Sequence, residues 1–176
     1  PRQIQWFINK QKDECRRSKD VEVGDDYFAE KMNQVYTAYE ELCERESLVD
    51  FGELLLRSYM LLRHNEQILE HYQRRFQHIL VDEFQDTNEV QYQFLRLLTN
   101  AGSHIMSVGD DDQSIYGWRG AKSENINRFT KDYAGTEVVK LEQNYRSTEI
   151  ILSAANAVIK NNQGRMGKDL WTEQKE

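Results

Sequence analysis

In the stretch Ile79-Leu80-Val81-Asp82-Glu83-Phe84-Gln85-Asp86, a short apolar run ends in two adjacent carboxylates, and the architecture expected for the chain follows from this pattern. The three apolar residues predict a strand buried on both faces of a parallel sheet. Asp82 and Glu83 follow at its carboxyl end, where open α/β sheets place their ligands. Neighbouring carboxylates repel each other unless a cation such as Mg²⁺ lies between them. The pattern therefore predicts a magnesium site at Asp82 and Glu83, with Glu83 also deprotonating an attacking water.

The composition indicates a protein without membrane spans or a disulfide framework. Of its 176 residues 39% are hydrophobic and 30% charged, and the net charge of −7 opposes a role as a general nucleic-acid coat while leaving room for a local basic groove. Cys15 and Cys43 are expected to be reduced thiols in a cytoplasmic protein. No signal peptide is visible, and a chain that begins at Pro1 is expected to be an internal fragment of a longer one.

The chain before residue 77 is predicted to be helical. Apolar residues recur at helical spacing over 3–18, 27–46 and 66–76. Asp50 and Glu53 form an Asp-x-x-Glu pattern, which predicts a helix start of the capping-box type. A large all-helical part is therefore expected at the N-terminus.

Strands and helices are expected to alternate after the opening stretch. Helical spacing is found over 88–99, 126–133 and 148–160, and strand-like apolar runs at 104–108 and at Val138, Val139 and Leu141. Such alternation predicts parallel strands joined by crossover helices. We therefore expect an α/β fold with an incomplete, RecA-like parallel sheet of about three strands.

A second motif, Val-Gly-Asp-Asp-Asp-Gln-Ser-Ile-Tyr-Gly-Trp-Arg-Gly-Ala, occupies residues 108–121 directly after a predicted strand. Gly109 permits a sharp turn, and Gln113 is a neutral donor suited to a terminal phosphate. Tyr116, Trp118 and Arg119 form a flat, amphipathic group suited to stacking unpaired bases and gripping a phosphate. The competing interpretation is a solvated acidic turn followed by a tryptophan of the hydrophobic core.

The third motif, Leu-Glu-Gln-Asn-Tyr-Arg-Ser, occupies residues 141–147. Arg146 has the chemistry of an arginine finger for charge on a γ-phosphate, and Tyr145 could stack on an adenine. The simpler interpretation of Arg146 is an ion pair with Glu142 or Glu149.

These three motifs, with Val-Asp-Phe-Gly-Glu-Leu-Leu at 49–55, resemble the UvrD/Rep/PcrA family of DNA helicases along essentially the whole chain. The resemblance implies ATP-driven 3′→5′ translocation on single-stranded DNA and unwinding of duplex DNA in repair, with ATP and Mg²⁺ as cofactors and repair proteins as possible partners. It implies magnesium binding by Asp82 and general base catalysis by Glu83. It further implies γ-phosphate contacts from Gln113 and Arg146, adenine stacking by Tyr145, and DNA contacts from Tyr116, Trp118 and Arg119.

The resemblance also implies a division of the chain. Residues 1–76 would belong to the helical insertion of the first motor domain, 77–142 to the second half of its RecA-like part, and 143–176 to the start of the second RecA-like domain. The sequence has no Gly-x-x-x-x-Gly-Lys-Ser/Thr phosphate loop, so the fragment alone is expected to be inactive. The alternative is a non-enzymatic module that binds DNA or a protein partner. A metal nuclease using Asp82, Glu83 and Asp86 is disfavoured, because no further ligand set is apparent.

Overall fold

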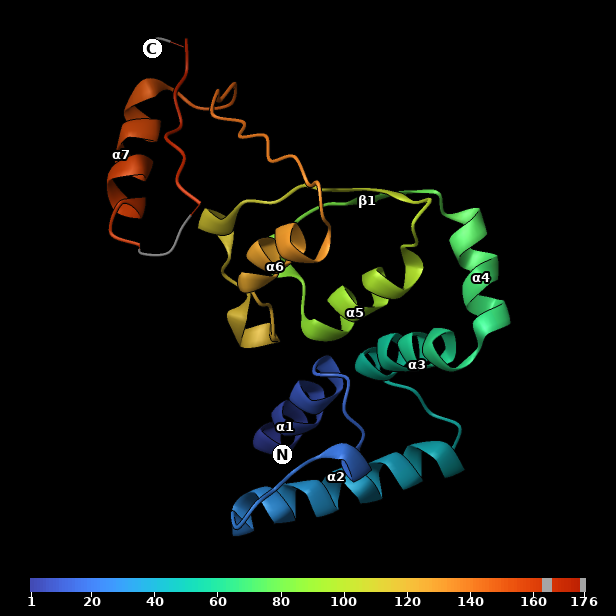
Figure 1. The fold of residues 1–176 in the computed structure, drawn as a ribbon. Helices are drawn as coiled ribbons and strands as arrows, with labels where there is room; N and C mark the ends of the chain where they lie inside the picture. The colour runs from blue at the N-terminus through green and yellow to red at the C-terminus, as the bar shows by residue number, and fades with distance from the viewer. Residues whose placement is uncertain (163–165, 175–176) are drawn as a thin grey trace.

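The computed structural model describes residues 1–162 and 166–174 and begins with a helical part (Figure 1). Its elements are α1 (Arg2–Asp13), the 3₁₀ turn η1 (Ser18–Asp20), α2 (Tyr27–Arg45), α3 (Phe51–His64) and α4 (Glu66–Arg75). This order confirms the helical character predicted for the first 76 residues. None of the helices in the described ranges is long and apolar enough to cross a membrane.

Asp50 starts α3 as its sequence pattern predicts. Its Oδ1 accepts a hydrogen bond from the backbone N–H of Glu53 at 2.7 Å, which satisfies one of the free donors at the helix start. The Glu53 carboxylate, however, accepts hydrogen bonds from Arg17 and Arg57 and pairs with Lys12. Glu53 thus joins α3 to other elements.

The second part of the chain combines helices with a parallel pair of strands. Its elements are β1 (His78–Val81), η2 (Phe84–Asp86), α5 (Glu89–Leu98), β2 (His104–Ser107), η3 (Asp111–Gln113), η4 (Gly117–Arg119), α6 (Glu124–Asp132) and α7 (Glu149–Ile159). The strands pair in register, with His78 opposite His104 and Val81 opposite Ser107. Helix α5 forms the crossover between them, the expected connection for parallel strands.

The predicted third strand is wrong. Val138, Val139 and Leu141 form no strand in the described part of the chain, and their side chains are exposed. An apolar run becomes a strand only where a second backbone lies alongside to pair with it, and this segment leads from α6 away from the sheet toward α7 (Figure 1). The fold shown is therefore α/β with two parallel strands, and the RecA-like sheet stays a prediction.

Burial of β1 on both faces is also wrong. Ile79 and Val81 pack against a core of Phe84, Tyr92, Leu95 and Phe129. Leu80 lies on the opposite face and is 77% exposed. Helices α5 and α6 both lie on one side of β1 (Figure 1), so only that face is covered. The apolar run alone could not reveal that asymmetry.

A second core fixes the helical part against the α/β part. It consists of Leu56 and Tyr59 of α3 and Val90 of α5, all buried. Hydrophobic burial of this kind is worth about 25 cal/mol per Å² of apolar surface. The carboxyl ends of the two strands are therefore held at a set position relative to α1 and α3.

Candidate functional site

Asp82 and Glu83 lie at the carboxyl end of β1 and are both exposed. The Oδ1 atom of Asp82 accepts a hydrogen bond from the backbone N–H of Glu83 at 2.9 Å. Glu83 adopts φ 50° and ψ 43°, the left-handed region that non-glycine residues seldom occupy. The chain thus turns sharply after the strand, and both carboxylates stay accessible at its end.

Gln85, which the sequence did not single out, joins the ends of the two strands. Its side chain is almost fully buried, at 1% exposure. Its Nε2 donates to Glu83 Oε2 at 2.7 Å, and its Oε1 accepts from the backbone N–H of Asp110 at 2.9 Å. Both ends of the amide are therefore used, one on the candidate base and one on the loop after β2. A single glutamine between Phe84 and Asp86 carries no periodic signal that could have predicted this position.

Gly109 permits that contact through its lack of a side chain. A Cβ at this position would lie 2.8 Å from Gln85 Oε1 and 3.2 Å from the backbone nitrogen of Phe84. The backbone here does not require positive φ, so close approach rather than a special turn explains the glycine. The expectation of a sharp turn is replaced by this packing reason.

In the acidic turn after β2, the Asp110 carboxylate is already bonded to neighbouring residues of the protein. Asp110 accepts hydrogen bonds from Asp112 N at 3.1 Å and Gln113 Nε2 at 2.7 Å, and pairs with Lys168 at 2.6 Å. Burial acts to raise the pKa of Asp110, but the bonds from Lys168 and Gln113 hold it below its ordinary value. Gln113 is therefore connected to Glu83 through two intermediate residues, since Gln113 bonds to Asp110, and Gln85 bonds to both Asp110 and Glu83.

The aromatic group predicted at 116–119 is present and accessible. The guanidinium carbon of Arg119 lies 4.6 Å from the ring centroids of both Tyr116 and Trp118. Trp118 is 61% exposed, so the interpretation as a core tryptophan is wrong. Tyr116 is half-buried. A cation beside an exposed indole ring is a surface on which unpaired bases can stack.

The third motif lies apart from the first two. Tyr145 and Arg146 are exposed in the segment before α7, and the Tyr145 hydroxyl donates to Gln143 at 2.7 Å. Among the described residues, no hydrogen bond or ion pair links the Arg146 side chain to the strand ends, nor to the acidic residues Glu142 and Glu149. The structure therefore brings together Asp82, Glu83 and Gln113 but not Arg146 or Tyr145.

A nuclease-like metal centre is not formed by the described residues. The group of three acidic side chains with ligand atoms within 4.8 Å of one another is Asp110, Asp111 and Asp112. Neither Asp82 nor Asp86 belongs to it within the described part of the chain.

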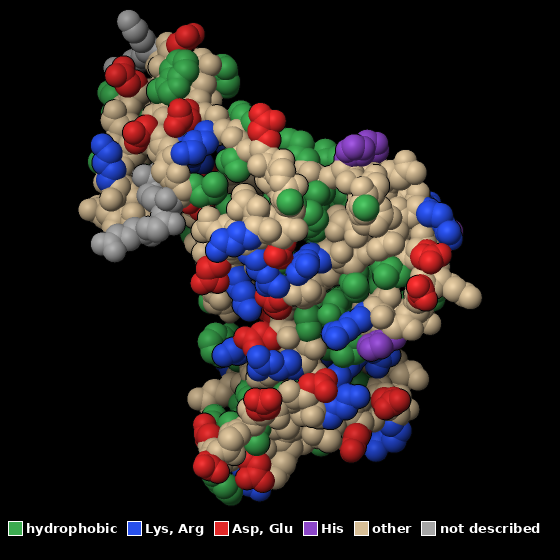
Figure 2. Space-filling view, viewed as in Figure 1, with side chains coloured by type: hydrophobic (Ala, Val, Ile, Leu, Met, Phe, Trp, Pro, Cys, Tyr) green, Lys and Arg blue, Asp and Glu red, His purple; other side chains and the backbone are tan. Residues whose placement is uncertain are grey.

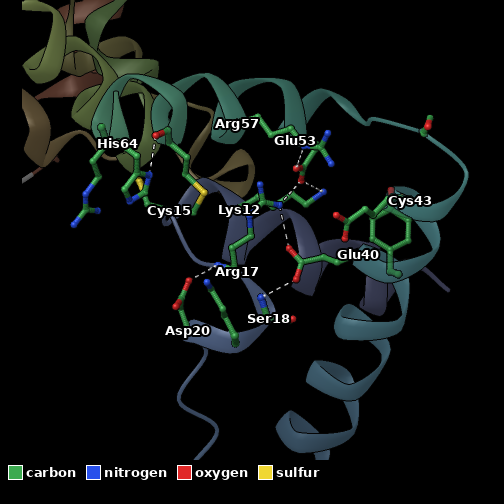
Figure 3. A pocket seen from close by; sticks show the side chains of 16 residues that line it. Lys12, Cys15, Arg17, Ser18, Asp20, Glu40, Cys43, Glu53, Arg57 and His64 are labelled. Atoms are coloured by element: carbon green, nitrogen blue, oxygen red, sulfur yellow. Dashed lines mark hydrogen bonds and ion pairs between the residues drawn. The ribbon is translucent and has the colours of Figure 1, made fainter. Parts of the chain in front are cut away.

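The helical part contains a cavity of about 890 Å³ between α1, α2 and α3. In Figure 3 its charged side chains point toward one another: Arg17 Nη1 contacts Glu40 at 3.1 Å and Glu53 at 2.7 Å, and Lys12 Nζ lies 3.0 Å from Glu53. Lys12 and Glu53 are buried. Their burial could not be predicted from the sequence, because charged residues in a helix are usually exposed to solvent. Because these charges neutralise one another, the cavity offers little to an ionic ligand.

On the face of the molecule drawn in Figure 2, charge alone does not mark a binding surface. Figure 2 shows Lys and Arg interleaved with Asp and Glu over the helical part, without a broad field of one sign. On that face, a nucleic-acid surface has to be recognised from local groups of rings and cations instead of from charge alone.

Comparison of the sequence with known proteins identifies a family and several relatives. Residues 1–134 match the family described as UvrD/REP helicase N-terminal domain. The chain is 56% identical over 173 residues to DNA helicase II of Escherichia coli (strain K12), and 44% identical to ATP-dependent DNA helicase PcrA of Staphylococcus aureus. Each match covers 98% of this chain and 24% of the relative. The chain thus spans about a quarter of the length of these relatives.

Proposed function

Because the chain belongs to the UvrD/REP helicase N-terminal domain family, we propose that it supplies the water-activating half of an ATP site and part of the DNA track of a 3′→5′ DNA helicase. The observation that carries this proposal is the buried amide of Gln85. It binds the candidate base Glu83 and the first residue of the loop that also holds Gln113 and Trp118.

The strand ends fit magnesium and a nucleotide. Asp82 and Glu83 offer accessible carboxylate oxygens, the donors that Mg²⁺ prefers. When bound, Mg²⁺–ATP supplies the phosphoryl group and neutralises charge during its transfer. Asp82 would hold the ion and Glu83 would accept the proton of the attacking water. Gln113 and Arg146 would contact the γ-phosphate, and Tyr145 the adenine.

Gln85 would couple DNA binding to the general base Glu83. Residues 110–121 form one loop that begins at the Gln85 contact and continues to the stacking surface of Tyr116, Trp118 and Arg119. Any displacement of this loop by a stacked base would act on Gln85 and, through it, on the Glu83 carboxylate. This is a short chain of packed polar contacts, the physical kind of link that coupling between two sites requires.

The proposed division of the chain follows the same family relationship. Residues 1–76 would be part of the helical insertion, 77–142 of the first motor domain and 143–176 of the second. The last of these is supported by contacts within its own segment: Asn144 N donates to Trp171 O at 2.7 Å, and Asn156 Nδ2 donates to Leu170 O at 2.8 Å. The same segment also contacts the loop after β2, because Lys168 pairs with Asp110 at 2.6 Å and the Met166 N–H donates to Asp111 Oδ2 at 2.6 Å. The division therefore rests mainly on the family relationship.

A chimera tests the proposal in a whole enzyme. This chain would replace the matching 173-residue segment of E. coli DNA helicase II. Glu83→Gln keeps the side-chain shape but removes the base, so we expect ATP binding to persist and turnover to fall at least ~10²-fold. The measurements are nucleotide affinity and phosphate release with single-stranded DNA.

Two further variants sharpen this test. Exposed Glu137→Gln is the matched control and should leave turnover unchanged. Gln85→Ala should lower the DNA-stimulated turnover as well, because it frees the Glu83 carboxylate. Near-normal turnover in Glu83→Gln would exclude Glu83 as the base. DNA binding that ignores nucleotide in the unaltered chimera would instead support the non-enzymatic module.

A further inference from the structure

A second cavity, of about 450 Å³, lies between α1 and the loop that contains η4. Trp6, Lys10 and Asp13 line it from α1, and Trp118, Arg119 and Gly120 line it from the loop. Its volume is within the range of small-molecule and nucleotide sites. One wall is the stacking surface already described, and the other comes from the helical part of the chain.

One face of helix α1 is buried in the protein, and the opposite face lines the cavity beside the loop that contains η4. Ile8, Gln11 and Lys12 are buried on one face. Trp6, Lys10 and Asp13 follow one another at intervals of four and three residues, so they lie along a single stripe on another face. The sequence pattern of α1 showed only its apolar positions, and this second stripe was missed.

The two walls are held close together. Gly120 has φ +84°, and a Cβ there would lie 3.0 Å from Asp13 Oδ2. Asp13 is itself fixed by Asn88, whose Nδ2 donates to Asp13 Oδ1 at 2.8 Å. Because Asn88 begins α5, the position of α1 relative to the loop is tied to the frame of the sheet. The cavity is therefore a defined feature of the fold.

Both walls expose the groups that single strands require. Trp6 is 63% exposed and Trp118 is 61% exposed, although large apolar rings are usually covered. Lys10 is exposed beside Trp6, and Arg119 lies over the Trp118 ring. Aromatic faces for bases together with cations for phosphates are the combination that binds single-stranded nucleic acid. Burial raises the pKa of Asp13 to about 6, with a smaller effect of Glu14, which weakens the negative charge of the cavity in mildly acidic solution.

We infer that Trp6 and Lys10 form the second wall of the single-stranded DNA track, with Trp6 stacking on an unpaired base and Lys10 contacting a phosphate. This inference rests on the proposed helicase function and extends it to α1. It makes the helical part of the chain a direct DNA contact instead of a support for the α/β part.

The test uses the same chimera and measures binding of fluorescently labelled oligothymidine. Trp6→Ala should weaken binding roughly tenfold, and Trp6→Phe should restore most of it, because phenylalanine keeps a face for stacking. Lys10→Ala should lower the slope of log affinity against log salt by about 0.7, the value for one phosphate on a single strand. Phe28→Ala, a change at an exposed ring on α2, is the matched control and should bind normally.

Comparison with Trp118 separates this inference from the proposed function. If Trp118→Ala weakens binding and Trp6→Ala does not, α1 is no part of the track and the inference fails while the helicase proposal stands. If neither variant weakens binding, the DNA side of the proposed function fails as well. Equal losses of single-stranded and duplex affinity in Trp6→Ala would also overturn the inference, because a base in a duplex offers no free face. If the variant that carries both Trp6→Ala and Trp118→Ala loses less affinity than the product of the two single fold-losses, the two rings are coupled and act on the same strand.

Discussion

At Glu83 the backbone takes a left-handed conformation that costs a non-glycine residue about 1–2 kcal/mol. The surrounding contacts retain it: Asp82 accepts from the Glu83 N–H, and Gln85 donates to its carboxylate. Strain of this kind is commonly found where a side chain must be aimed for function. The sequence correctly placed Asp82 and Glu83 at the end of a strand, because they end an apolar run, and their catalytic roles stay predictions. It could not predict Gln85, since one buried amide leaves no periodic trace.

The ionisation of Asp13 makes the stability of the folded chain depend on pH. Its carboxyl pKa is raised by burial from 3.8 to about 6, so the folded state binds a proton more tightly than the unfolded state does. This contribution to stability is fully present below pH ~4 and is lost as the pH rises through about 6. We therefore expect Asp13→Asn to raise the melting temperature of the chain by a few degrees at pH 7.5 and to leave it nearly unchanged at pH 4.

Thermal unfolding at the two pH values checks this expectation. Asn can still accept the hydrogen bond from Asn88, so the contact at 2.8 Å need not be lost. Asp25→Asn, at an exposed position, serves as the control and should give the same melting temperature as the unaltered chain at both pH values. An equal shift at pH 4 and pH 7.5 would mean that ionisation of Asp13 is not the cause.

At the scale of elements, the helices were predictable and the sheet was not. Periodic apolar positions and the cap at Asp50 define the helices through local interactions. A strand depends instead on a partner far away in the sequence, which explains why Val138, Val139 and Leu141 were misread. The exposed face of Leu80 was missed for the same reason, because covering a strand depends on where α5 and α6 lie. The position of the candidate site at the strand ends was thus predictable, whereas the cavity beside α1 was not, because it depends on how α1 packs against the loop that contains η4.

A cluster of ion pairs joins α1, α2 and α3. Lys12 is 2% exposed and lies 2.7 Å from Asp50 and 3.0 Å from Glu53. Removing one member of a buried pair leaves the other charge without compensation. We expect Lys12→Ala to lower the free energy of unfolding by about 3 kcal/mol, measured by urea denaturation of the chain.

Lys10→Ala is the control for this prediction, because it removes the same charge from an exposed position on the same helix. Its effect should stay within about 0.5 kcal/mol. A similar small effect for Lys12→Ala would show that Arg17 and Arg57 are enough to compensate Glu53, and that the cluster tolerates the loss of one cation.

For the whole molecule, we expect the 176-residue chain by itself to hydrolyse no ATP. Phosphoryl transfer depends on positioning and charge neutralisation, and the sequence has no phosphate loop to supply backbone donors and a lysine. Asp82 and Glu83 would repel a triphosphate without them, and Arg146 makes no described contact with these strand ends. ATP affinity should be no better than about millimolar, near −4 kcal/mol.

Phosphate release from the purified chain, with and without single-stranded DNA, measures this directly. The expected rate equals that of buffer under both conditions. DNA-stimulated release that disappears in Glu83→Gln would contradict the expectation, because it would show that the chain completes a catalytic site through other groups.

The parallel pairing of β1 and β2 through α5 also bears on how the chain folds. Residues 78 and 104 meet with one α-helix, α5, and the short 3₁₀ turn η2 between them, so the entropy of closing this loop is modest compared with pairing distant strands. We therefore expect the crossover to bring Asp82 and Asp110 to adjacent strand ends at a lower entropic cost than strands from distant parts of the chain would require.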